Sequence, residues 1–135
     1  MRIALYVALG CGLGGVARIL VTNLMLRLPE PHFPVGVLTV NVLGSLTIGI
    51  LAAVTAPGGN FFPSPAFRQF LMAGFCGGFT TFSFFSLETL LLLQDGRITI
   101  AAIHSTATLL ISMLGVWIGY RAGTRGAILP QDTAP

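Results

Sequence analysis

Four long apolar stretches separated by short turn-forming segments constrain the fold of this chain more than any other feature. A helix that crosses a membrane needs about 20 apolar residues. The candidate spans are residues 3–26, 35–54, 67–93 and 98–120, followed by a polar tail over 121–135. Only 8% of the 135 residues are charged, whereas a soluble domain carries about 25%. The sequence therefore predicts an all-α integral membrane protein with one transmembrane domain of four helices.

The distribution of charge leaves the orientation in the membrane open. All seven basic residues are arginines. With an even number of spans, the arginines on one side are Arg2, Arg68, Arg121 and Arg125, and those on the other are Arg27 and Arg97. This bias is weak under the positive-inside rule. Both a fixed topology with cytoplasmic termini and insertion in both orientations remain possible.

The third stretch contains the segment GFCGGFTTFSFF over residues 74–85. Its 27 residues, 67–93, would form a helix of roughly 40 Å, longer than a hydrocarbon core of about 30 Å. We expect the adjacent glycines Gly77 and Gly78 to interrupt this helix. The freed carbonyl groups would form a cation site facing protein or water. Alternatively, both glycines permit close helix packing.

Pairs of small residues four positions apart predict close contacts between helices. The pairs are Gly10 with Gly14, Cys11 with Gly15, and Gly115 with Gly119. Small residues let helix backbones approach in lipid. A four-span bundle is also too thin to enclose much of a polar pathway alone. Together these features predict an oligomer.

Seven of the ten phenylalanines fall between Phe67 and Phe85. Phe82 and Phe85 are three residues apart and share a helix face. Because the edge of a phenyl ring is positive, two edges turned toward a pore would favour an anion. Core packing or lipid contact is the ordinary alternative.

Polar residues recur within the predicted spans. The neutral ones are Asn41, Thr81, Ser83, His104, Thr108 and Ser112, and the ionisable ones are Arg18 and Glu88. The residues on the fourth span form a stripe with Gly115 and Gly119, which would face a partner helix or a pore. Charged groups are costly at membrane depth, so Arg18 and Glu88 are candidates for function, for snorkelling or for a structural pair.

Three segments resemble the Fluc/CrcB family of small bacterial fluoride channels. They are GFCGGFTTFSFFSLE in the third span, GLGGVAR in the first and VNVLGSLTIG in the second. The resemblance implies a dual-topology homodimer of antiparallel subunits in the bacterial inner membrane, with two fluoride pores. It also implies a structural sodium ion at the dimer centre, held by the backbone carbonyls of Gly77 and Thr80.

The same resemblance implies roles for individual side chains. The fluoride pathway would use Asn41, Phe82, Phe85, Thr108, Ser112, Thr81 and His104, with Arg18, Ser83 and Glu88 in a vestibule or polar track. One position departs from the family. Members commonly read TTFSTFS, whereas this chain reads TTFSFFS. Phe84 therefore replaces a threonine expected between Thr81 and Glu88, which would interrupt a hydroxyl track.

The expected function is passive export of fluoride down its electrochemical gradient. The main alternative is a small proton-coupled exporter that uses Glu88 as its alternating carboxylate, and a second is a non-transporting assembly subunit. An enzyme is not expected, because paired catalytic carboxylates and nucleophile–base constellations are missing from the sequence. The partners predicted are fluoride, a second copy of the chain and the lipid bilayer, with no nucleic acid.

Overall fold

The computed structural model describes residues 1–26 and 33–125, and all regular secondary structure in these residues is helical. The elements are α1 (Arg2–Met25), α2 (Val35–Val54), α3 (Pro65–Gln69), the π-helical segment η1 (Phe70–Cys76), α4 (Gly77–Phe79), α5 (Phe82–Gln94) and α6 (Ile98–Arg125). Because α3 to α5 form one stretch, Pro65–Gln94, the described residues contain four stretches long and apolar enough to cross a membrane. The predicted all-α architecture with four spans is confirmed. The last helix extends past the predicted end at Tyr120 to Arg125.

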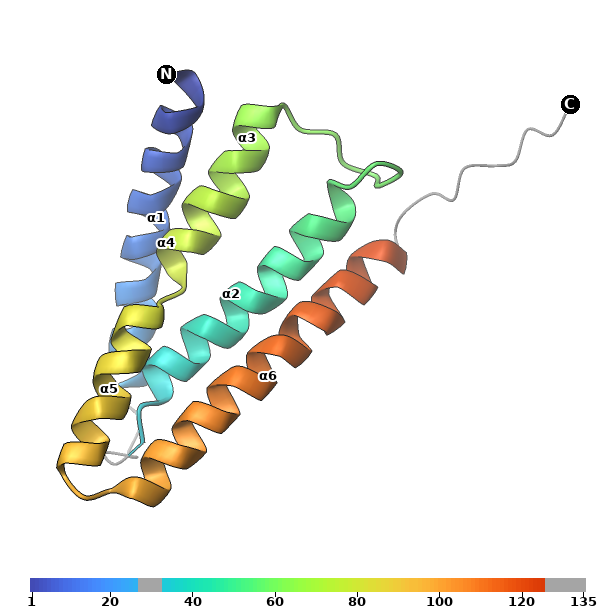
Figure 1. Cartoon of the computed structure of the whole chain (residues 1–135). Helices are drawn as coiled ribbons and strands as arrows, with labels where there is room; N and C mark the ends of the chain where they lie inside the picture. Colours follow the sequence, from blue (N-terminus) through green and yellow to red (C-terminus); the bar gives the residue numbers. More distant parts are fainter. Residues whose placement is uncertain (27–32, 126–135) are drawn as a thin grey trace, which may run out of the picture.

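Successive spans run in opposite directions (Figure 1). The chain leaves one end along α1, returns along α2, leaves again along the third stretch and returns along α6. Arg2 at the start of α1, Arg68 in α3 and Arg121 near the end of α6 therefore share one end of the molecule. Arg97 lies at the opposite end, just before α6. Arg27 is outside the described residues, and the side that faces the cytoplasm stays a prediction.

Glycines bring α1 into close contact with η1. A Cβ atom added to Gly74 would lie 2.9 Å from the Val7 carbonyl oxygen, and one added to Gly10 would lie 2.9 Å from the Gly74 Cα. One added to Gly14 would lie 2.8 Å from the backbone nitrogen of Phe79 in α4. These distances are too short for a side chain, so only glycine permits this approach of helix backbones.

The close helix contacts predicted from small-residue pairs are confirmed for Gly10 with Gly14 and for Gly115 with Gly119, whereas the oligomer stays a prediction. Gly10 and Gly14 pack within the chain, as described above. On α6, a Cβ added to Gly119 would lie 3.1 Å from the Ile50 backbone nitrogen of α2. One added to Gly15 would meet nothing within 4 Å. The pairs at 10–14 and 115–119 therefore pack against other helices of the same chain, whereas Gly15 leaves space beside it open.

The third stretch is interrupted after the glycine pair. Thr80 (φ −82°, ψ 161°) and Thr81 (φ −152°, ψ 119°) are extended, and α5 begins at the next residue. The expected interruption at Gly77 and Gly78 is therefore wrong in position, since both belong to α4. Gly78 is needed for packing, because a Cβ there would lie 2.8 Å from the Cys11 Cα in α1.

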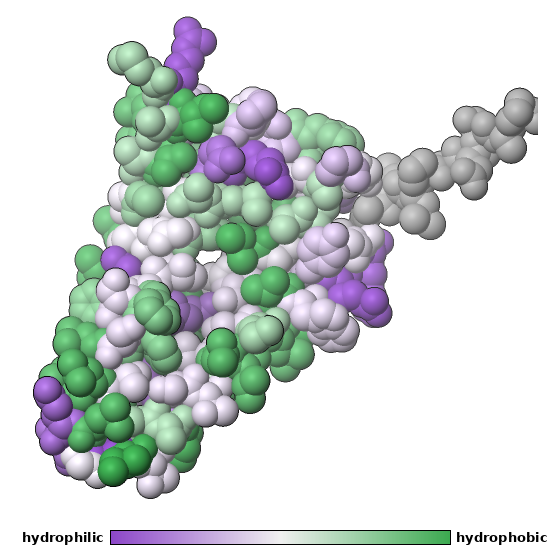
Figure 2. All heavy atoms as spheres, viewed as in Figure 1, coloured by the Kyte–Doolittle hydropathy of each residue, from purple (hydrophilic) through white to green (hydrophobic). Residues whose placement is uncertain are grey.

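Apolar side chains extend along the whole visible face of the molecule, and most strongly hydrophilic residues lie toward its ends (Figure 2). Large exposed apolar residues occur on every span, among them Leu9, Ile50, Leu90 and Leu110. In water such a surface would be unfavourable, whereas hydrocarbon solvates it. The exposed apolar surface is therefore the one that a membrane-embedded bundle needs.

Candidate functional site

Asn41 on α2 pairs with the backbone of Thr81. The Asn41 Nδ2 donates to the Thr81 carbonyl oxygen at 3.1 Å, and its Oδ1 accepts from the Thr81 N–H at 2.8 Å. In a continuous helix this N–H would donate to the Gly77 carbonyl oxygen, four residues earlier. The asparagine amide therefore replaces helix hydrogen bonds that the extended residue gives up, as backbone at membrane depth requires.

Thr80 is held by α1 and by its own helix. Arg18 Nη1 donates to the Thr80 carbonyl oxygen at 3.3 Å. The Thr80 N–H and hydroxyl both donate to the Cys76 carbonyl oxygen, at 3.0 Å each. Thr81 Oγ1 accepts from the Phe84 N–H at 3.2 Å and so caps the N-terminus of α5. The two extended residues are thus fixed by two different neighbouring helices.

An open cavity of about 430 Å³ lies beside this interruption. The predicted site residues that line it are Asn41, Gly77, Thr80, Thr81, Phe82, Phe85, Thr108 and Ser112. Ser45, Met72 and Cys76 also line it and were missed by sequence reasoning. Ser45 follows Asn41 by four residues and shares its helix face, which could have identified it. No pattern in the sequence identifies Met72 and Cys76 as cavity residues. They line the cavity because of the way the third stretch packs against the other helices.

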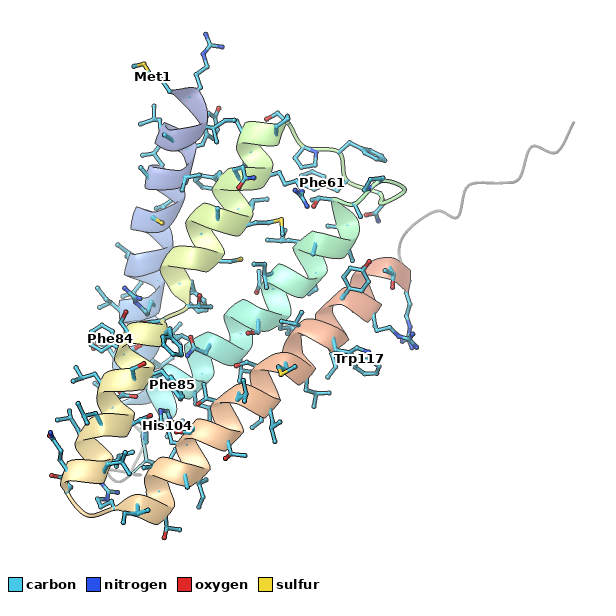
Figure 3. All side chains as sticks on the ribbon, viewed as in Figure 1. Met1, Phe61, Phe84, Phe85, His104 and Trp117 are labelled. Carbon is cyan, nitrogen blue, oxygen red and sulfur yellow. The ribbon has the colours of Figure 1, made fainter. Side chains whose placement is uncertain are left out.

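Two aromatic rings at the cavity lie close together. The ring centroids of Phe82 and Phe85 are 5.6 Å apart, with planes inclined by 43°. Phe82 is 79% exposed in the single chain, whereas Phe85 is partly buried and its ring centroid is 5.3 Å from that of His104. In Figure 3, Phe84 lies on the side of α5 toward α1, and Phe85 lies toward α2. Phe84 therefore does not enter the cavity.

The predicted polar stripe on α6 faces the interior. His104 is fully buried and Thr108 is 7% exposed. Buried nitrogen and oxygen atoms of His104, Thr108 and Ser112 have no hydrogen-bond partner among the described residues. The same holds for Glu88 Oε2, which lies 3.8 Å from His104 Nε2. Because buried polar atoms normally have hydrogen-bond partners, these unpaired atoms can form hydrogen bonds to a small polar ligand or ion.

The predicted side-chain site residues that do not line the cavity are His104, Arg18, Ser83 and Glu88. Ser83 is exposed, and Arg18 contacts the interruption from the opposite side, through the Thr80 carbonyl. Thr81 and Glu88 were predicted to share one track, but they have different partners. The Thr81 hydroxyl caps α5, and the Glu88 carboxylate lies near His104.

Comparison with known proteins identifies the family. Residues 5–120 match the family described as CrcB-like protein, Camphor Resistance (CrcB). Fluoride-specific ion channel FluC 1 of Rhodopseudomonas palustris (strain BisB18) is 45% identical over 126 residues, which cover 92% of this chain and 89% of the relative. Fluoride-specific ion channel FluC of Opitutus terrae is 43% identical, with coverage of 90% and 92%, and that of Coxiella burnetii is 42% identical, with coverage of 88% and 95%. With its four membrane-crossing helices, this chain therefore belongs to the CrcB family of multi-pass membrane proteins.

Proposed function

We propose that this chain forms a fluoride-selective channel that exports fluoride passively across the bacterial inner membrane. The names of the relatives, all fluoride-specific ion channels, support the substrate. The observation that carries the proposal is the cavity beside Thr80 and Thr81, lined by neutral donors and two phenyl rings. Because the relatives are ion channels, we propose a channel and not an enzyme.

Fluoride is small and strongly hydrated, so a pore must replace its water without binding it too tightly to leave. Asn41 uses one Nδ2–H for the Thr81 carbonyl, and an amide nitrogen carries two hydrogens. Its second N–H and the hydroxyls of Thr108 and Ser112 can donate to an anion in turn. All three are neutral, so they stabilise the ion without the deep trap that a buried cation would form.

The rings of Phe82 and Phe85 add a weaker contribution at the cavity. Their edges carry partial positive charge and can meet an anion where its water has been removed. The tilt of 43° between the ring planes gives the two edges different directions. An anion that moves past the rings would therefore contact the edge of one ring and then the edge of the other. Two weak successive contacts favour conduction over tight binding. Once a second subunit narrows the open cavity, a larger ion such as chloride would fit poorly and would be admitted slowly.

The carbonyl groups at the interruption suit a structural sodium ion. Because the Thr81 N–H donates to Asn41, the Gly77 carbonyl loses its usual helix donor. The Thr80 carbonyl accepts from Arg18 and keeps a second lone pair for a cation, but the guanidinium charge would weaken binding there, so Gly77 would be the stronger ligand. We propose that Gly77 and Thr80 hold the ion together with the same groups of a second subunit. When bound, sodium would offset part of the cost of an anion at membrane depth.

We further propose that the active form is an antiparallel homodimer with dual topology. The cavity is open in the single chain, and Phe82 is 79% exposed beside it. An open, partly polar cavity at membrane depth cannot face lipid without cost. A second copy in the inverted orientation would cover it and would divide it into two pathways. The weak bias of the arginines would permit insertion both ways.

The test is fluoride efflux from liposomes that contain the purified chain, with chloride efflux as the control. We expect fluoride to leave rapidly and chloride to be retained. Equal efflux of the two ions, or no efflux of either, would contradict the proposal. Glu88→Gln should retain substantial fluoride efflux, because a channel needs no alternating carboxylate. Complete loss of efflux in this variant would instead indicate proton-coupled export.

A further inference from the structure

Arg18 lies within α1 (Arg2–Met25), seven residues before its C-terminal end, where a charged group in a span is costly and needs nearby partners. Its Nη1 donates to the Thr80 carbonyl oxygen at 3.3 Å. Its Cζ lies 5.9 Å from the centroid of the Phe84 ring. The guanidinium therefore lies between the interruption of the third stretch and an aromatic ring at the start of α5.

The contact with the ring has the geometry of a cation–π interaction. Such interactions occur within about 6 Å of the ring centroid and strengthen when water is excluded. Phe84 is well placed to hold the cation, because the Thr81 hydroxyl accepts from its N–H and fixes the first turn of α5. Figure 3 shows this ring on the side of α5 toward α1, away from Phe85 and His104.

The backbone of the interruption is thereby held at two consecutive residues from opposite directions. Asn41 of α2 holds the N–H and carbonyl of Thr81. Arg18 of α1 holds the carbonyl of Thr80. Arginine has a long flexible stem, and a single hydrogen bond at 3.3 Å does not fix its orientation. A second contact is needed to keep the guanidinium on that carbonyl, and Phe84 supplies it.

We propose that Phe84 is a positioning residue whose ring holds the Arg18 guanidinium against the Thr80 carbonyl and so fixes the interruption beside the cavity. A threonine at this position, as in the commoner TTFSTFS sequence, would offer no ring face. Its effect on fluoride flux rests on the proposed function, whereas its effect on stability does not.

The alternative is that Phe84 contributes only apolar surface, toward lipid or a second subunit, since it is 53% exposed. Adding fluorine to the ring distinguishes the two possibilities, because it would lower the stability of the protein in one case and keep or raise it in the other. Each fluorine withdraws electron density from the ring face and weakens its attraction for a cation. Each fluorine also makes the ring more apolar, so a purely hydrophobic contact would keep or gain strength.

The experiment replaces Phe84 with phenylalanines that carry one, two and three ring fluorines, in the parent protein and in Arg18→Gln. The unfolding equilibrium is measured in mixed micelles, and fluoride efflux is measured in liposomes. In the parent, we expect the unfolding equilibrium constant to rise stepwise, by roughly two- to fivefold over the series, with efflux falling in the same order. In Arg18→Gln, both series should be flat.

A flat unfolding series in the parent, or the same slope in Arg18→Gln, would overturn the proposal. If Arg18→Gln does not fold, Phe84→Trp and Phe84→Leu provide the second test. Tryptophan retains a ring face and should leave the unfolding constant within about twofold of the parent, whereas leucine should raise it by roughly two- to fivefold. Equal constants for the two variants would also overturn it. A parent protein that passes no fluoride would contradict the proposed function alone, because the unfolding series still tests the contact.

Discussion

Replacing Asn41 by leucine tests whether its amide holds the interrupted helix together. Leucine has the same branching and the same number of side-chain heavy atoms, and the open cavity beside Asn41 can take its larger methyl groups. The change therefore removes both hydrogen bonds to Thr81 without adding a polar group. The Thr81 N–H and carbonyl would then lack the partner that their extended conformation requires. Both groups belong to a residue that borders the cavity, where water replaces the lost bonds only in part because Thr81 is 8% exposed.

The expected loss of stability follows from these two bonds. An unsatisfied buried donor or acceptor costs about 1–3 kcal/mol, which gives about 2–6 kcal/mol for the pair. Measured hydrogen bonds between membrane helices average only about 0.6 kcal/mol, because the unfolded protein in the membrane finds other partners. We therefore expect Asn41→Leu to lower the free energy of unfolding by about 2–4 kcal/mol.

The assay is denaturation in mixed micelles at fixed protein concentration, with Thr47→Val as the matched control. Thr47 lies on the same helix, and its hydroxyl donates to the Leu43 carbonyl oxygen of its own helix at 2.8 Å. That carbonyl also takes part in the helix, so the control should cost less than about 0.5 kcal/mol. If Asn41→Leu costs no more than the control, the amide does not stabilise the interruption, and our account of Thr81 is wrong.

Three further substitutions probe separate features. Gly14→Ala should destabilise the fold by about 1–3 kcal/mol, because its Cβ would lie 2.8 Å from the Phe79 backbone nitrogen. The control Gly12→Ala should be tolerated, since its Cβ meets nothing within 4 Å. Equal unfolding curves for the two variants would contradict the close contact of α1 with α4. Thr81→Val removes the cap of α5 and should cost about 1 kcal/mol, while Thr81→Ser should restore the parent value in the same denaturation assay. Phe82→Ile should lower fluoride efflux about tenfold, the equivalent of about 1.4 kcal/mol. The proposed dimer should persist on size-exclusion chromatography. Unchanged efflux would show that this ring is not part of the pathway.

Sequence reasoning identified half of the residues that line the cavity. Asn41, Phe82 and Phe85 could be selected because a polar amide or paired rings within an apolar span are unusual. Thr108 and Ser112 could be selected because they recur at helical spacing. His104 shares that spacing and was predicted in the pathway, yet it does not line the cavity, and neither do Ser83 and Glu88 of the predicted polar track. Periodicity identifies a helix face, but it does not say which neighbour that face meets.

The interruption illustrates why local propensity was insufficient. A pair of glycines weakens a helix, so Gly77 and Gly78 were the natural place to expect a break. Both remain helical, and Gly78 instead permits close packing, since α1 leaves no room there for a side chain. The chain departs from the helix at Thr80 and Thr81, where Arg18 and Asn41 supply hydrogen bonds from other helices. Those bonds join residues far apart in the sequence and have no local signature.

The sequence alone determined that the chain is an all-helical membrane protein with four spans. Hydrophobic length and the scarcity of charge decide that outcome without reference to any contact, because lipid excludes unpaired backbone. Only the tertiary structure decided how the helices use their small and polar residues. It assigned the glycine pairs to internal packing, the amide of Asn41 to the backbone of Thr81, and the ring of Phe84 to Arg18. The physical reason is that these roles depend on which side chains meet between helices, and that is set by packing in three dimensions.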